Sequence, residues 1–138
     1  MATENVKSVR SEDPEMFAAI KEARDSFRKF LDAFVAPKEK QSAFLVKIAF
    51  TKDETVEHIW LADLNLNGPK PSGVIANPPL RKDLKFKQRV EIDFTYLSDW
   101  MFIEDGILIG GFTTRLLRKR MTPDERRKND EASPYRFQ

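Results

Sequence analysis

A run of short strand-like segments in the middle of the chain limits the possible folds more than any other feature. Between residues 43 and 111, segments rich in apolar residues are separated by polar or glycine- and proline-containing turns. The segments cover residues 43–50, 56–64, 73–79, 89–97 and 101–111. Strands joined by short turns pair antiparallel, whereas parallel strands need long crossovers. This stretch therefore predicts an antiparallel, strongly twisted and curved sheet or a small open barrel.

A helical segment precedes the strands. Asp13 can cap a helix, and Pro14 at the first helical position loses no backbone donor that the helix needs. Apolar residues then recur at helical spacing until the chain reaches Pro37. They are Met16, Ile20, Ala23, Phe27, Phe30 or Leu31, and Phe34. We therefore expect an amphipathic helix over residues 14–35 that packs on the sheet, which makes the fold class α+β.

The end of the chain also has helical character. Residues 112–129 contain a modest apolar side, and the sequence Thr-Pro-Asp-Glu at residues 122–125 is a capping box that begins a new short helix. We expect short C-terminal helices followed by a loose tail over residues 130–138. With a flexible leader over residues 1–12, this arrangement predicts a single domain over residues 13–129.

Composition narrows the possible classes of function. The 138 residues contain no cysteine, which excludes disulfides, thiolate metal sites and thiol nucleophiles, and favours a reducing, cytoplasmic location. No apolar run approaches the length of a membrane span, so we expect no membrane partner. Residues 112–138 carry eight Lys and Arg against four Asp and Glu, a bias more typical of a solvated face than of a nucleic-acid footprint. No nucleic-acid-binding motif accompanies it, so nucleic acid is not an expected partner.

Five segments carry a resemblance to a known family. In chain order they read FLVKIAF, VEHIWLADL, GVIANPP, SDWMFIEDGILIGGFTTRLLRKRM and TPDER. Together they resemble the YegJ-like bacterial family, domain of unknown function 2314, over roughly residues 16–128. The resemblance implies a shared fold. It implies no activity, because the family has none assigned.

His58 is the only histidine of the chain and shares a predicted strand face with Val56 and Trp60. A metal site would need further ligands, and the chain has no second histidine and no cysteine, so we expect no metal and no cofactor. A serine nucleophile would need a strained elbow such as G-x-S-x-G, which is absent. A hydrogen-bonded strand residue is the favoured interpretation, with ligand recognition and then catalysis as the alternatives.

The segment from residue 98 to residue 120 concentrates the remaining unusual residues. Asp99 and Trp100 follow a predicted strand at an expected bend, where they either fix a corner or, with Trp60, line an aromatic groove. Residues 104–106, Glu-Asp-Gly, predict a hairpin turn. The glycine pair at residues 110–111 favours a tight strand-to-helix turn over an anion site.

A basic ridge of Arg115, Arg118 and Lys119 completes this segment, because these residues lie three and four positions apart on a predicted helix. We interpret the chain as a non-enzymatic binding or regulatory module that recognises a protein partner, of unassigned oligomeric state. The candidate binding residues are His58, Trp60, Asp99, Trp100, Arg115 and Arg118. The alternative is a small enzyme that acts on an anionic substrate with His58, Asp99, Glu104 and Arg115. A pocket that brings three of these four residues together would favour the enzyme.

Overall fold

A computed structural model describes residues 13–138, so the leader expected over residues 1–12 lies outside the described part. The elements are, in chain order, α2 (Pro14–Asp25), α3 (Phe27–Val35), β1 (Gln41–Lys52), β2 (Thr55–Asn65), β3 (Ser72–Ile75), β4 (Arg89–Glu91), a 3-10 turn (Phe94–Tyr96), β5 (Leu97–Glu104), β6 (Ile107–Gly110), α4 (Phe112–Lys119) and α5 (Pro123–Ala132).

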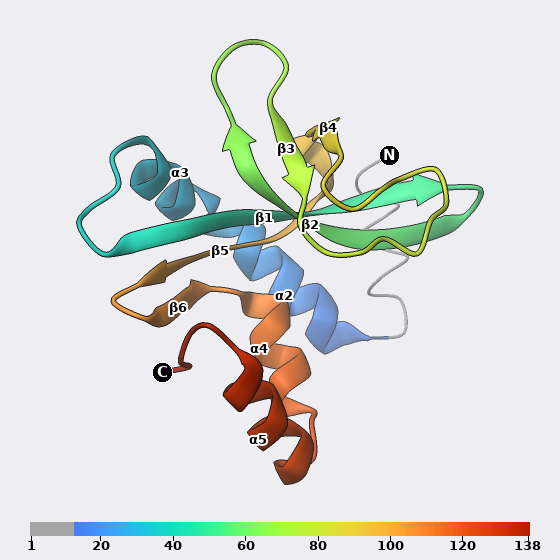
Figure 1. The fold of residues 1–138 in the computed structure, drawn as a ribbon. Coiled ribbons are helices and arrows are strands. Elements are labelled where there is room, and N and C mark those ends of the chain that lie inside the picture. Colours follow the sequence, from blue (N-terminus) through green and yellow to red (C-terminus); the bar gives the residue numbers. More distant parts are fainter. Residues whose placement is uncertain (1–12) are drawn as a thin grey trace.

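The strands form one six-stranded sheet in the order β4-β3-β2-β1-β5-β6. Each neighbouring pair is antiparallel, and the sheet stays open, which confirms the α+β class with a curved antiparallel sheet (Figure 1). The hairpin turn predicted after Glu104 is also confirmed. Asp105 and Gly106 both have positive φ, at 54° and 78°, as a two-residue hairpin turn with the right twist requires.

The core lies between one sheet face and the two N-terminal helices. Val46 of β1 is opposite both Leu61 of β2 and Trp100 of β5, so these fully buried side chains share one face. Phe30 of α3 is also fully buried, and its ring lies 5.9 Å from the indole of Trp100. Ile20 of α2 is 1% exposed. The apolar stripe predicted for the N-terminal helical segment therefore packs on the sheet.

The helix predicted over residues 14–35 is interrupted at Ser26, which separates α2 from α3. The Ser26 hydroxyl donates to the carbonyl of Glu22 at 2.7 Å and lies 3.3 Å from that of Ala23. Serine in a helix competes for carbonyls of the preceding turn and bends the chain. The bend lets α2 pack beside α4 and β5 while α3 turns its phenylalanines onto the sheet.

The strand predicted over residues 89–97 is shorter in the structure. β4 ends at Glu91, and the Asp93 side chain accepts the backbone N–H of Thr95 at 2.9 Å, which begins a 3-10 turn. Asp99 and Trp100 consequently lie inside β5 and not at a bend. The register between β1 and β5 shifts beside them, since Lys47 is opposite Asp99 but Ile48 is opposite Leu97.

The C-terminal helices follow the sequence prediction, and the capping box at Thr122 and Glu125 is confirmed. The tail differs from the expected loose segment, because residues 130–132 continue α5 and Arg136 pairs with β6. The Arg136 carbonyl accepts the N–H of Leu108 at 2.9 Å, and its own N–H donates to Gly106 at 2.8 Å. These bonds satisfy part of the outer edge of the sheet.

Candidate functional site

Asp99 holds the beginning of α4 from a neighbouring strand. Its carboxylate accepts the backbone N–H groups of Phe112 at 3.0 Å and Thr113 at 2.9 Å, together with the Thr113 hydroxyl at 2.5 Å. Gly111 occupies the N-cap position of α4 with φ of 66° and has no side chain that could cap the helix. Asp99 therefore supplies the acceptor that an N-cap residue would normally provide.

Lys47 extends this arrangement from β1. Its Nζ donates to the Thr113 hydroxyl oxygen at 2.7 Å, and its charge lies close enough to Asp99 to affect that carboxyl. Burial raises the pKa of Asp99, against the opposing effects of the Thr113 hydrogen bond and the Lys47 charge. Burial likewise lowers the pKa of Lys47, and the Asp99 charge opposes this. Asp99 and Lys47 thus stabilise each other in a region where neither charge is well solvated.

His58 of β2 approaches the same region through Ser98. Its Nδ1 lies 3.0 Å from the Ser98 hydroxyl oxygen, and that hydroxyl donates to the Lys47 carbonyl at 3.3 Å. This network assigns the imidazole proton to Nδ1. The Nε2 atom is buried and makes no hydrogen bond within residues 13–138. Burial, and then the charge of Lys47, lowers the pKa of His58 to about 4, so the ring is neutral at pH 7.

These residues form a polar cluster on the sheet face opposite the core, defined as Lys47, His58, Ser98, Asp99 and Thr113. Trp60 borders it, with the Lys47 Nζ 4.9 Å from the centre of its ring. Sequence reasoning had not singled out Lys47 or Thr113. The available signal was a lysine in the middle of the apolar strand segment AFLVKIAF. A cation at such a position needs polar neighbours, and here they are the Thr113 hydroxyl, which accepts its hydrogen bond, and the nearby charge of Asp99.

Trp100 faces the opposite side of the sheet and is 1% exposed. Its indole N–H donates to the Ala23 carbonyl of α2 at 2.9 Å, which joins the helix to the sheet. Gly110 packs directly against the indole, because a Cβ atom at this position would lie 2.6 Å from the ring. The glycine pair thus permits close packing and the turn into α4, as its favoured interpretation predicted.

Arg115 and Arg118 are engaged with the C-terminal part of the chain. The Arg115 guanidinium donates to the carbonyls of Leu108 at 2.6 Å and Gly110 at 2.8 Å. Arg118 pairs with Asp130 at 2.7 Å and lies 4.4 Å from the ring centre of Phe137. These contacts hold α4 against β6 and the tail, so the basic ridge is largely occupied within the molecule.

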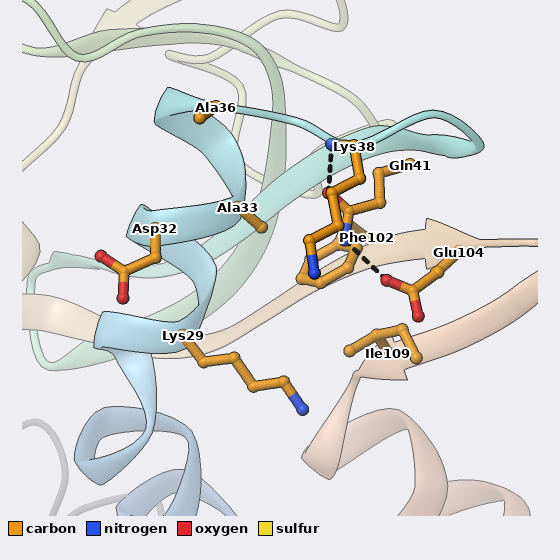
Figure 2. A pocket seen from close by; sticks show the side chains of 9 residues that line it. All are labelled: Lys29, Asp32, Ala33, Ala36, Lys38, Gln41, Phe102, Glu104 and Ile109. Atoms are coloured by element: carbon orange, nitrogen blue, oxygen red, sulfur yellow. Dashed lines mark hydrogen bonds between the residues drawn. The ribbon is translucent and has the colours of Figure 1, made fainter.

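A groove lies between the helices α2–α3 and the segment from β6 to α4, and we call it the helix–hairpin groove. It consists of two hollows of about 510 and 370 Å³ that share Lys29 and Ile109 in their linings. The larger hollow has Trp100, Phe112 and Arg115 in its wall. The smaller hollow has Phe102 in its wall and Gln41 and Glu104 at its rim (Figure 2).

Of the charged side chains around the smaller hollow, the two acidic ones have hydrogen-bond partners and the two lysines have no ion pair within the described residues. Glu104 accepts a hydrogen bond from Gln41 at 2.6 Å, and Asp32 pairs with Arg28 at 3.1 Å. Lys29 and Lys38 have no ion pair within the described residues, and both are exposed. Figure 2 shows both lysine side chains extending toward the space between α3 and the β5–β6 hairpin, whereas the Asp32 carboxylate points away from it. The rim therefore presents two ammonium groups that have no ion pair within residues 13–138.

The structure does not assemble the four residues of the enzyme alternative. Glu104 lines the smaller hollow and Arg115 the larger one, while Asp99 is fully buried under α4. His58 lies on the sheet face opposite the helix–hairpin groove, and its Nδ1 is engaged with Ser98. In the part of the chain that the structure describes, no three His, Cys, Asp or Glu side chains form a group that could hold a metal ion.

A comparison with protein families places the chain. The family described as an uncharacterized protein conserved in bacteria, DUF2314, matches residues 13–137. The chain belongs to this bacterial family. The resemblance of the five sequence segments is thereby confirmed, and the matched region includes the polar cluster and the helix–hairpin groove. The description of the DUF2314 family assigns no activity.

Two curated relatives are similar to the chain. The uncharacterized protein YegJ of Escherichia coli K12 is 33% identical over 99 residues, which cover 71% of this chain and 63% of that protein. A "Putative ankyrin repeat protein" of Neisseria meningitidis serogroup B is 36% identical over 93 residues, which cover 64% of this chain and 37% of that protein. The chain thus spans less than two thirds of each relative. No solved structure matches it. Among residues 13–138, no helix has the length and apolarity needed to cross a membrane.

Proposed function

We propose that the chain is a non-enzymatic binding module that recognises a protein partner in the helix–hairpin groove. The observation that carries this proposal is the combination of an apolar wall with two ammonium groups at the rim that have no ion pair in the described part of the chain. Apolar anchors seated in hollows and charges at the rim are the usual arrangement of protein recognition surfaces. Trp100 and Arg115, two of the candidate binding residues from the sequence, line the larger hollow.

The chemistry of the groove indicates the kind of segment that it would bind. Ile109 and Phe112 are half-buried and can be covered further by an apolar side chain of the partner. Lys29 and Lys38 would pair with carboxylates beside that side chain, because neither lysine has an ion pair within residues 13–138, whereas the Asp32 carboxylate is paired with Arg28. The expected ligand is therefore a segment in which apolar residues are flanked by Asp or Glu.

Two further facts support a binding role in the cell. The relative from Neisseria meningitidis is named as an ankyrin repeat protein, and solenoids of that type use extended concave surfaces to bind. The 138 residues contain no cysteine and therefore no disulfide, as is common for proteins of the reducing cytoplasm, and this supports a cytoplasmic location. A regulatory role in that compartment is part of the same proposal.

Site-specific photo-crosslinking tests the groove. A photoreactive phenylalanine analogue replaces Lys29 or Lys38 in the full chain, and a third variant carries it in place of Lys128, which lies on α5 outside the groove. All three variants are illuminated in lysate of a bacterium that encodes the chain. We expect one protein to crosslink from positions 29 and 38 and not from position 128.

The charge-reversed variant Lys29→Glu/Lys38→Glu completes the test. Both side chains are exposed, so the fold should be retained, as circular dichroism can check. Binding of the crosslinked protein should weaken at least tenfold in this variant. Equal crosslinking from all three positions, or unchanged affinity after charge reversal, would refute the groove as the binding site.

A further inference from the structure

The loop between β3 and β4, residues 76–88, runs beside the β1–β2 hairpin (Figure 1). It has no regular secondary structure, yet its backbone is anchored to β2. The Glu57 carboxylate accepts the N–H groups of Leu80 at 2.7 Å and Arg81 at 3.1 Å, and the Asn77 side chain accepts the N–H of Trp60 at 2.8 Å. Long loops that are held in place in this way are usually functional.

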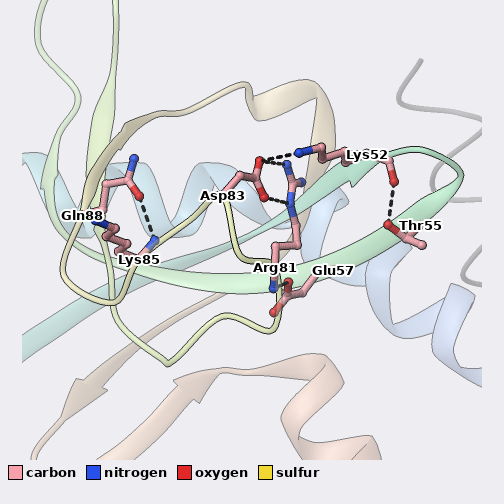
Figure 3. A network of polar contacts seen from close by, with 7 residues as sticks. All are labelled: Lys52, Thr55, Glu57, Arg81, Asp83, Lys85 and Gln88. Carbon is pink, nitrogen blue, oxygen red and sulfur yellow. Dashed lines mark hydrogen bonds and ion pairs between the residues drawn. The ribbon is translucent and has the colours of Figure 1, made fainter.

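The charges of this loop are arranged so that its one acidic group is neutralised internally. Residues 80–89 contain five Lys and Arg and a single acid, Asp83. Asp83 pairs with Arg81 at 2.6 Å and with Lys52 of β1 at 3.6 Å (Figure 3). The remaining lysines of the loop are exposed and have no ion pair within residues 13–138. They are Lys82, Lys85 and Lys87.

The same loop exposes large apolar side chains. Leu80 is 90% exposed, the highest value for a large apolar side chain in the described residues, and Phe86 is 48% exposed. Phe86 stands between Lys85 and Lys87, and the Lys87 ammonium lies 5.5 Å from the centre of its ring. Keeping both side chains in water is unfavourable, and an apolar environment would remove that cost.

We propose that the segment from Leu80 to Lys87 binds the surface of a membrane that contains anionic phospholipids. Leu80 and Phe86 enter the boundary between headgroups and acyl chains, while the three lysines bind the headgroup phosphates and carboxylates. Long lysine stems allow the ammonium groups to stay at the surface while the neighbouring apolar side chains are inserted.

The side chains favour a lipid surface over a nucleic acid. Binding of single strands depends on several flat aromatic side chains on which successive bases stack, whereas residues 80–87 contain one aromatic side chain, Phe86, and the more exposed Leu80 is aliphatic. A bilayer also accepts separate apolar side chains without a matching pocket, which a folded protein partner would have to provide. The lack of a long apolar run in the sequence argues against a membrane-spanning segment, whereas a peripheral contact of this kind needs only a few residues.

Flotation with lipid vesicles tests this proposal on the full chain. We expect binding to vesicles of phosphatidylcholine with phosphatidylserine but not of phosphatidylcholine alone, and weaker binding as salt is raised. Leu80→Ser should weaken binding about tenfold. Replacing Lys82, Lys85 and Lys87 by Ala should weaken it roughly fivefold for each charge removed. The matched control is Val35→Ser, because Val35 on α3 is 80% exposed but lies outside the loop.

Several outcomes would overturn the proposal. They are no binding to the anionic vesicles, equal binding to both vesicle types, and an equal loss in Val35→Ser. Binding of a single-stranded RNA oligonucleotide that depends on the lysines but not on Leu80 would replace the lipid by a nucleic acid. Because the helix–hairpin groove shares no residue with this loop, the Lys29→Glu/Lys38→Glu variant should still bind vesicles, so that the two proposals can fail separately.

Discussion

Replacing Asp99 by alanine tests whether this carboxylate is the external cap of α4. The substitution removes the acceptor of two helix N–H groups, those of Phe112 and Thr113, and of the Thr113 hydroxyl. It also leaves the ammonium group of Lys47 without its neighbouring negative charge. Asp99 itself is 0% exposed. Water therefore cannot take the place of its carboxylate without local rearrangement.

The expected loss of unfolding free energy can be bounded from these contacts. A buried donor left without an acceptor costs about 1–3 kcal/mol, and the two helix N–H groups lose theirs, whereas Lys47 keeps its hydrogen bond to Thr113 and loses only a nearby negative charge. Because burial raises the pKa of Asp99, its removal also relieves some desolvation cost. We therefore expect a net loss of about 4 kcal/mol, a large part of the stability of a typical domain of this size.

Urea unfolding followed by far-ultraviolet circular dichroism and tryptophan fluorescence measures this loss. Asp99→Asn should be intermediate, since the amide retains one acceptor oxygen and the shape of the side chain. Thr122→Ala, which removes the exposed cap of α5, is the matched control and should cost about 1 kcal/mol. A loss from Asp99→Ala no greater than that from Thr122→Ala would refute the reasoning.

Three other substitutions test separate parts of the fold. Since the pKa of His58 is about 4 when folded and ordinarily about 6.5, stability should fall as pH drops from 6.5 to 4, by about 3 kcal/mol, and His58→Gln should remove this fall in pH-dependent urea titrations. In Gly110→Ala the new Cβ would lie 2.5 Å from the Trp100 carbonyl oxygen, whereas in Gly68→Ala no atom of a non-adjacent residue would lie within 4 Å of the new Cβ. Gly110→Ala should therefore lower the melting temperature far more than Gly68→Ala. Phe27→Ala should cost about 3 kcal/mol in urea unfolding, because its ring stacks on Phe30 and contacts Phe94, and an unchanged midpoint would contradict that packing.

Features with a local cause could be predicted from the sequence. The capping box depends on Thr122 and Glu125, which are three positions apart. The hairpin turn depends on the adjacent residues Asp105 and Gly106. Alternation along the strands likewise reflects burial on one face, so the antiparallel sheet was accessible to sequence reasoning. The break at Ser26 could not be predicted from the sequence. The apolar stripe continues across Ser26 without interruption, and the break arises because the serine hydroxyl competes for the Glu22 carbonyl.

The polar cluster depends on contacts between distant parts of the chain. Lys47 and Thr113 are 66 positions apart, and Asp99 is 14 positions from Thr113. The pairing of β1 with β5, the pairing of β5 with β6 and the turn of the chain at Gly111 together bring them into contact. The sequence showed that Asp99 was unusual, but its role as a cap follows from a register that no local pattern encodes.

The capping of α4 by a strand residue has a consequence for the order of folding. An isolated α4 begins at a glycine and lacks the acceptor for its first N–H groups, so a short helix of this kind should not form early. It acquires the cap only after β5 has paired with β6, since that pairing places Gly110 opposite Met101 and so brings the beginning of α4 beside Asp99. The amide hydrogens of Phe112 and Thr113 should therefore exchange with solvent only when this part of the sheet opens, and formation of α4 reports that β5 and β6 have found their register.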